Sequence, residues 1–105
     1  MRDLMNLVKQ AQEMQGQLKK LQDELAQMTI TGTAGGGMVV AEVNGQGLIK
    51  SIKIDPSVVN PSDTEMLEDL VAVAVGDAQR KAQEAAEAQT SKLAGGMNLP
   101  FKLPF

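Results

Sequence analysis

Apolar residues at the start of the chain recur at alternating spacings of three and four positions. The stripe consists of Leu4, Leu7, Ala11, Met14, Leu18, Leu21, Leu25 and Met28. This spacing places the side chains along one face of an α-helix, as in helices that pack lengthwise against another helix. Gly16 lies on the opposite face, where it weakens the helix without interrupting the stripe. The pattern predicts one long amphipathic helix.

From residue 29 to residue 54 the helical spacing gives way to β-branched and alternating positions. Short strands are predicted over residues 29–33, 38–44 and 48–54. Gly35-Gly36-Gly37 separates the first two strands, and Asn44-Gly45-Gln46-Gly47 is expected to supply the positive-φ residues of a tight hairpin between the second and the third. The prediction is a three-stranded antiparallel meander.

A second long helix is predicted after Pro61. Ser62 and Glu65 have the spacing of a capping box, in which two side chains satisfy the first free backbone amides of a helix. The helix is expected to run to about Leu93, where Ala94-Gly95-Gly96 ends it. Its first half is apolar on nearly every side, and the residues predicted for the core and for a dimer contact are Leu67, Leu70, Val71, Val73, Ala74 and Val75.

The two helices are too long to lie inside one small body, and the all-round apolar segment from Met66 to Val75 needs a second copy of the chain to cover it. At 1.5 Å per residue they would span roughly 36 Å and 45 Å, whereas a compact chain of this length has a diameter of about 33 Å. We therefore expect an α+β fold of long helix, three-stranded antiparallel meander and long helix, assembled as a homodimer with projecting helical arms. If the helices pack antiparallel, the residues near Arg2 and those from Arg80 to Lys92 would lie together, far from the sheet.

Domain organisation is simple. Residues 1–93 are predicted to form a single dimerising domain. Residues 94–105 contain glycine, proline and two Leu-Pro-Phe motifs, and we expect a tail that is either mobile or docked as an extended peptide.

Composition excludes several kinds of chemistry. The 105 residues include no cysteine and no histidine, so disulfides and sites with thiolate or imidazole ligands are excluded, and the commonest general base is missing. We expect a protein that is not an enzyme, with no metal, no cofactor and no small-molecule substrate. No apolar run approaches the ~20 residues of a membrane span and no signal-peptide pattern is present, so we expect no membrane partner and a cytoplasmic location.

Three segments match the pattern of a known family. They are the block from Gly35 to Gly45, the triplet Ile54-Asp55-Pro56 and the run from Glu65 to Leu70. With them, and with its N-terminal helix and its GGMNLPF motif, the chain resembles the YbaB/EbfC family of nucleoid-associated DNA-binding proteins. The resemblance implies an intertwined homodimer with helices between two sheets and tweezer-like helical projections. It also implies that double-stranded DNA is a partner, contacted by the projections, and that the protein associates with the nucleoid.

Basic residues on the predicted arms are the candidate phosphate contacts. The first group is Arg2, Lys9, Arg80, Lys81 and Lys92, and the second group, nearer the body, is Lys19 and Lys20. The formal net charge is -3, and acidic residues alternate with these cations: Asp3, Glu13, Asp77, Glu84 and Glu87. Ordinary solvated helix faces therefore remain an alternative, and any DNA binding is expected to be weak, salt-sensitive and dependent on the dimer.

A protein-interaction adaptor is the rival hypothesis from a different class. In that case the helical stripe, the acidic start of the second helix or the Leu-Pro-Phe tail would recruit another protein. Neutralising the arms would then leave activity intact, whereas deleting residues 97–105 would abolish it.

Overall fold

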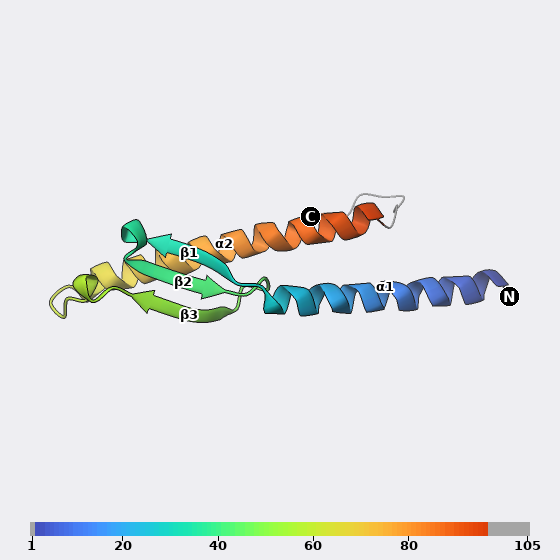
Figure 1. Ribbon diagram of the computed structural model, residues 1–105, viewed down its shortest axis with the longest axis horizontal. Helices are drawn as coiled ribbons and strands as arrows, with labels where there is room; N and C mark the ends of the chain where they lie inside the picture. Colours follow the sequence, from blue (N-terminus) through green and yellow to red (C-terminus); the bar gives the residue numbers. More distant parts are fainter. Residues whose placement is uncertain (1, 97–105) are drawn as a thin grey trace.

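The computed structural model describes residues 2–96, and its elements follow the predicted order (Figure 1). They are helix α1 (Arg2–Gln27), strand β1 (Ile30–Ala34), the 3₁₀ turn η1 (Gly35–Gly37), strands β2 (Val39–Val43) and β3 (Ile49–Ile54), the 3₁₀ turn η2 (Pro56–Val58) and helix α2 (Thr64–Gly96). The predicted α+β class and the three-stranded antiparallel meander are confirmed. Residues 97–105, most of the predicted tail, lie outside the described residues.

The sheet has β2 at its centre, paired antiparallel with β1 on one side and β3 on the other. Ala41 lies opposite Gly32 of β1 and opposite Ile52 of β3. Asn44 closes the hairpin between β2 and β3, because its side-chain oxygen accepts hydrogen bonds from two backbone amides of the turn, at 2.9 and 3.0 Å. The strands therefore form where the alternating pattern places them, with their ends shifted by about one residue.

Helix α2 packs on one face of this sheet through small side chains. Ala74, Ala78 and Ala82 recur every four residues and are fully buried, as are Val39 and Val43 of β2. The contact is so close that a Cβ atom at Gly32 of β1 would collide with the backbone of Ala74 and Ala78. The core is therefore built around an alanine stripe that fits directly on the sheet.

The predicted core residues of α2 lie at different depths. Ala74 is fully buried, and Leu70, Val71 and Val75 are partly buried against the core. Leu67 is half-buried, whereas Val73 is 59% exposed within the single chain. The centre of the contact extends to Ala82, two turns beyond the predicted segment, because the alanine-rich half of α2 also lies on the sheet.

Both ends of α2 differ from the prediction. The amide of Met66 donates to the Asp63 carboxylate at 3.3 Å, so Asp63 caps the helix and the predicted Ser62 does not. Ser62 instead donates its own amide to the Asn60 side chain at 2.9 Å, within a turn that precedes the helix. At the other end the helix continues past Leu93 to Gly96, so Ala94-Gly95-Gly96 does not end it where predicted. The first proline after the helix, which would break it, is Pro100.

The chain is elongated, with extents of 72 × 21 × 17 Å and a radius of gyration of 19.7 Å, compared with about 13 Å for a compact chain of this length. Both helices project from the sheet in the same direction (Figure 1). We call residues 25–82 the body, and residues 2–24 and 83–96 the arm. No helix within residues 2–96 has a segment long and apolar enough to cross a membrane.

Candidate nucleic-acid interface

The arm is joined to the body at Leu25, which is buried at 8% exposure. Its carbonyl oxygen accepts a hydrogen bond from the Gly45 amide at 2.7 Å. A Cβ atom at Gly45 would lie 2.8 Å from that oxygen and 2.9 Å from Leu25 Cδ2. Helix α1 therefore begins its projection at a contact that only glycine allows.

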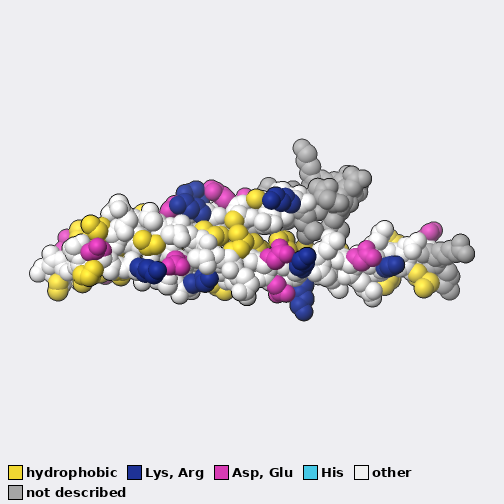
Figure 2. Space-filling view, viewed as in Figure 1, with side chains coloured by type: hydrophobic (Ala, Val, Ile, Leu, Met, Phe, Trp, Pro, Cys, Tyr) yellow, Lys and Arg dark blue, Asp and Glu magenta, His cyan; other side chains and the backbone are white. Residues whose placement is uncertain are grey.

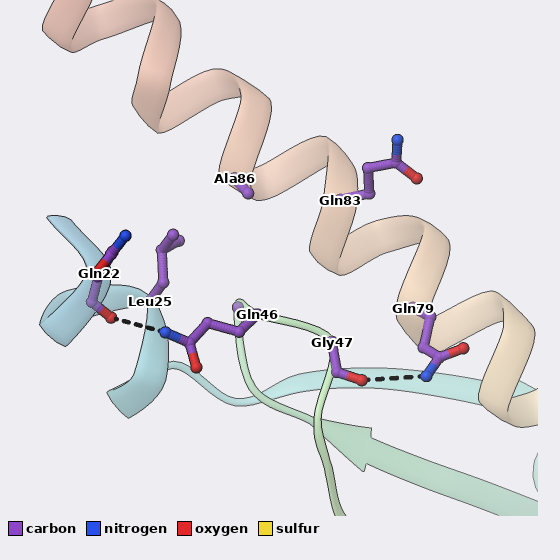
Figure 3. Close-up of a pocket in the computed structure, with 8 residues that line it drawn as sticks. Gln22, Leu25, Gln46, Gly47, Gln79, Gln83 and Ala86 are labelled. Atoms are coloured by element: carbon purple, nitrogen blue, oxygen red, sulfur yellow. Dashed lines mark hydrogen bonds between the residues drawn. The ribbon is translucent and has the colours of Figure 1, made fainter. Parts of the chain in front are cut away.

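A cleft of about 570 Å³ opens between the two helices beside this joint. The hairpin turn between β2 and β3 lies at its base (Figure 3). Gln46 of the turn donates to the Gln22 carbonyl at 3.4 Å, and Gln79 of α2 donates to the Gly47 carbonyl at 3.0 Å. The turn thus holds both helices apart, and direct contacts between α1 and α2 are sparse.

Farther out, one groove between the helices brings two of the predicted DNA contacts together. Lys20 of α1 and Lys92 of α2 line a cleft of about 350 Å³ together with Gln17, Leu21, Glu24 and Gln89. Both lysines are exposed. The sequence places them 72 positions apart, and only the antiparallel alignment of the helices brings them to one groove.

Four of the lysines predicted to contact DNA have no acidic partner among the described side chains. Lys9, Lys19, Lys20 and Lys92 are exposed and form no ion pair with another side chain of residues 2–96. Arg2 is the first residue of α1 and lies at the far end of the arm. On the face seen in Figure 2, basic side chains are interspersed with acidic ones and form no continuous patch.

Arg80 and Lys81 are not at the tip of the arm, which corrects the prediction that they lie far from the sheet. Helix α2 is still on the sheet at this point, because Ala78 and Ala82 are buried on either side of them. Asp77 binds both cations: its carboxylate lies 2.9 Å from Arg80 Nη2 and 3.0 Å from Lys81 Nζ. Arg80 also contacts Glu84 at 2.9 Å.

Asp77 was absent from the predicted site, although it has the strongest electrostatic role on α2. Besides its two ion pairs, it accepts the Thr33 backbone amide of β1 at 3.2 Å. The Lys81 hydrogen bond, followed by those of Thr33 and Arg80, lowers the pKa of Asp77 to about 2. The spacing of three and four residues to Arg80 and Lys81 was a usable signal for the ion pairs, but no local pattern marks the Thr33 contact.

Two apolar surfaces lie open in the single chain. The first is the N-terminal end of α1, where Leu4, Met5, Leu7 and Val8 are 51–71% exposed. The second is the part of the sheet that α2 leaves bare, since the helix covers β1 and β2 but not β3. Ile52 and Ile54 of β3 pair with the buried Ala41 and Val39, so they share the face that carries the core, yet each is 38% exposed.

Comparison with known proteins gives consistent matches along nearly the whole chain. A model of the YbaB/EbfC DNA-binding family matches residues 1–97. A nucleoid-associated protein of Gemmatimonas aurantiaca is 50% identical over 103 residues, which cover 98% of this chain and 99% of the relative. A nucleoid-associated protein of Bartonella bacilliformis is 43% identical over 107 residues, with 100% and 99% covered.

The fold has also been seen in a solved structure. The crystal structure of an uncharacterized protein from Helicobacter pylori matches with a TM-score of 0.64 at 25% sequence identity, covering 89% of this chain and 94% of that one.

Among residues 2–96, no group of three or more acidic side chains is arranged to hold a metal ion.

Proposed function

Because the chain belongs to the YbaB/EbfC DNA-binding family, we propose that it is a homodimer that grips duplex DNA through the phosphates with its projecting arms. It would act at the nucleoid, in the cytoplasm, on chromosome organisation or gene expression. The observation that carries this proposal is the arm itself, with four exposed lysines that no described carboxylate neutralises.

Phosphate contacts are the mode of binding that these side chains support. Lysine binds phosphate as a point charge and releases condensed counterions without reading bases. The only aromatic residues are Phe101 and Phe105, so within residues 2–96 no aromatic side chain is present on which bases could stack. We therefore expect binding to duplex DNA with little sequence preference and a strong dependence on salt.

A second copy of the chain is the proposed cover for the bare part of the sheet. Ile49, Ile52 and Ile54 on β3, together with Val73 on α2, leave apolar surface in water that a folded chain normally buries. Closed two-fold pairing is the commonest way for identical chains to cover such a surface. The pair would carry two arms, so one duplex could be held at two places.

Salt-titrated binding tests the DNA proposal with matched variants. The arm variant Lys20→Gln/Lys92→Gln and the body variant Lys50→Gln/Lys53→Gln each remove two positive charges, and in the body Lys53 already pairs with Glu42 at 3.2 Å. We expect the arm variant to bind about tenfold more weakly near 50 mM salt, and its salt slope to fall by about 0.9 for each phosphate that it no longer neutralises. The body variant should stay within about twofold of wild type.

Two results would reject the DNA proposal. One is the absence of duplex binding by the wild-type protein even at low salt. The other is an equal decrease in affinity in both variants, which would mean that net charge matters and the arm does not.

Light scattering tests the dimer. The expected mass is twice the 11.2 kDa of the chain. Ile52→Glu should yield monomers, because it places a charge on the surface that the second copy would cover. A Lys50→Glu control on the same strand should remain dimeric. A monomeric mass for the wild type at micromolar concentration contradicts the proposal.

A protein-interaction adaptor is the second candidate, and the exposed apolar end of α1 favours it. Leu4, Met5 and Leu7 are each more than 60% exposed, which suits a groove on another protein. Under this alternative, Leu4→Ser/Leu7→Ser would abolish the function of the protein in the cell, whereas duplex binding in vitro would stay unchanged. The proposed tail contact, residues 97–105, lies outside the described residues.

A further inference from the structure

Asp77 occupies the point where α2 crosses strand β1, and its carboxylate makes three contacts there. Oδ2 accepts the Thr33 amide at 3.2 Å and lies 3.0 Å from Lys81 Nζ. Oδ1 lies 2.9 Å from Arg80 Nη2. The carboxylate is therefore held by the sheet on one side and binds two cations on the other.

The cations around Asp77 are neutralised in full. Arg80 Nη1 is bound by Glu84 at 2.9 Å while Nη2 is bound by Asp77, so both ends of the guanidinium group are occupied by carboxylates. Arg80 and Lys81 carry +2 and Asp77 and Glu84 carry -2, which sum to zero. A cluster with no net charge attracts phosphate less strongly than two unpaired cations would.

We propose that Asp77 sets the DNA affinity of this protein by keeping Arg80 and Lys81 paired and away from phosphate. This inference rests on the proposed function, because it concerns the strength of the same interaction. Asp77 is a positioning residue: it acts on DNA through the two cations. Arg80 and Lys81 bind phosphate only after they separate from Asp77, and the duplex competes with that carboxylate.

Asp77 is better suited to this role than Glu84. The Asp77 side chain is 24% exposed and fixed by the β1 amide, whereas the Glu84 side chain is 62% exposed and, among the described residues, forms an ion pair only with Arg80. A flexible exposed glutamate can turn away from an approaching phosphate at little cost. The lowered pKa of Asp77 keeps it ionised at neutral and mildly acidic pH.

The test is duplex binding by Asp77→Asn over a series of salt concentrations. Asparagine retains an oxygen for the Thr33 amide and removes only the charge. We expect the variant to bind duplex at least about threefold more tightly than wild type near 50 mM salt and to show a steeper salt slope, since Lys81 loses its ion pair and Arg80 keeps only the exposed Glu84 as a partner. Asp69→Asn is the matched control, because Asp69 is an exposed carboxylate on α2 without an ion pair among the described side chains. It should change affinity less than about twofold.

A double-mutant cycle separates the proposal from a general effect of charge. Arg80→Gln/Lys81→Gln leaves Asp77 and Glu84 unpaired and should therefore weaken binding in the wild-type background. With both cations removed, Asp77→Asn should raise affinity no more than the Asp69→Asn control does. Should Asp77→Asn fail to fold, Glu84→Gln is expected to give a smaller gain that Arg80→Gln alone removes.

Three outcomes overturn the inference while leaving DNA binding in place: no change in Asp77→Asn, weaker binding in Asp77→Asn, or a gain that persists without Arg80 and Lys81. The second of these would mean that Asp77 orients the cations for phosphate. Absence of binding by the wild type and by every variant would instead reject the proposed function.

Discussion

The two long helices of this protein are held to it in different ways. Helix α2 buries Ala74, Ala78 and Ala82 against the sheet, so its first half is part of the body. Helix α1 buries only Leu25 among its described residues, and from there it extends away from the sheet. One helix is thus fixed along much of its length, whereas the other is fixed at one end.

The apolar side chains on the two helices also differ in size. The buried contact of α2 is made of alanine, while the exposed stripe of α1 carries large side chains such as Leu4, Leu7 and Leu18, which are 63%, 62% and 42% exposed. Small residues permit close contact within one chain. Large apolar residues in water indicate a surface that is complete only in an assembly. A search for the largest apolar side chains would therefore place the core of the single chain on α1, whereas the buried contact is made by the alanines of α2.

The largest effect is expected where the body is tightest. Gly32→Ala would place a Cβ atom against the backbone of Ala74 and Ala78, so α2 must lift from β1. We expect the free energy of unfolding, measured by urea denaturation, to fall by about 3 kcal/mol or more. Gly76→Ala on the outer side of α2, where the new Cβ atom has no neighbour within 4 Å, should not destabilise the protein.

A smaller effect is expected at the joint between body and arm. Gly45→Ala would place a Cβ atom 2.8 Å from the Leu25 carbonyl oxygen, which breaks the hydrogen bond from the Gly45 amide. The free energy of unfolding is expected to fall by about 1–2 kcal/mol, with faster amide exchange at residue 45 and in α1. Unchanged exchange there would contradict the view that this contact anchors the arm.

Within the arm, Gly16→Ala should stabilise α1 by about 1 kcal/mol, because alanine is the stronger helix former and the site is open. Amide exchange in α1 should slow about fivefold. If the arm is independent of the body, the thermal midpoint of the body should not move. An equal rise in both would show that the two regions unfold as one unit.

The smallest effect concerns stability in acid, through the contact of Asp77 on α2 with strand β1. The folded pKa of Asp77 is about 2, below the ordinary value of 3.8, so its contribution is present above pH 3.8 and is lost as the pH falls toward 2. The difference in urea midpoint between wild type and Asp77→Asn should therefore shrink between about pH 4 and pH 2. A difference that stays constant over this range would exclude the titration of Asp77 as its cause.

Periodicity in the sequence was sufficient for the elements and their order. The stripe from Leu4 to Met28 and the turn at Asn44 depend on neighbours close in the chain, and both were predicted correctly, although of the two glycines in the turn only Gly47 has a positive φ. Two adjacent residues, Ser62 and Asp63, were both suitable caps. Asp63 is the cap, because Ser62 belongs to the preceding turn, where its amide donates to the Asn60 side chain.

The candidate site was harder to predict from the sequence, because it depends on contacts between distant segments. The position of α2 along the sheet determines that Arg80 lies over the body and that Asp77 reaches Thr33, 44 residues away. The alignment of the two helices determines that Lys20 meets Lys92. Neither alignment is encoded in a short stretch of sequence. For this reason the list of cations could be predicted, but not which of them are paired.

The central claim is that the arm, and not the exposed strand β3 of the body, makes the main contact with DNA. Amide chemical-shift mapping of the labelled protein, titrated with a short duplex at low salt, tests it residue by residue. The account predicts shifts concentrated around Lys9, Lys19 and Lys20 of α1 and Lys92 of α2, which disappear as salt is added. Shifts concentrated on β3 around Lys50 and Lys53, with the arm unaffected, would contradict it.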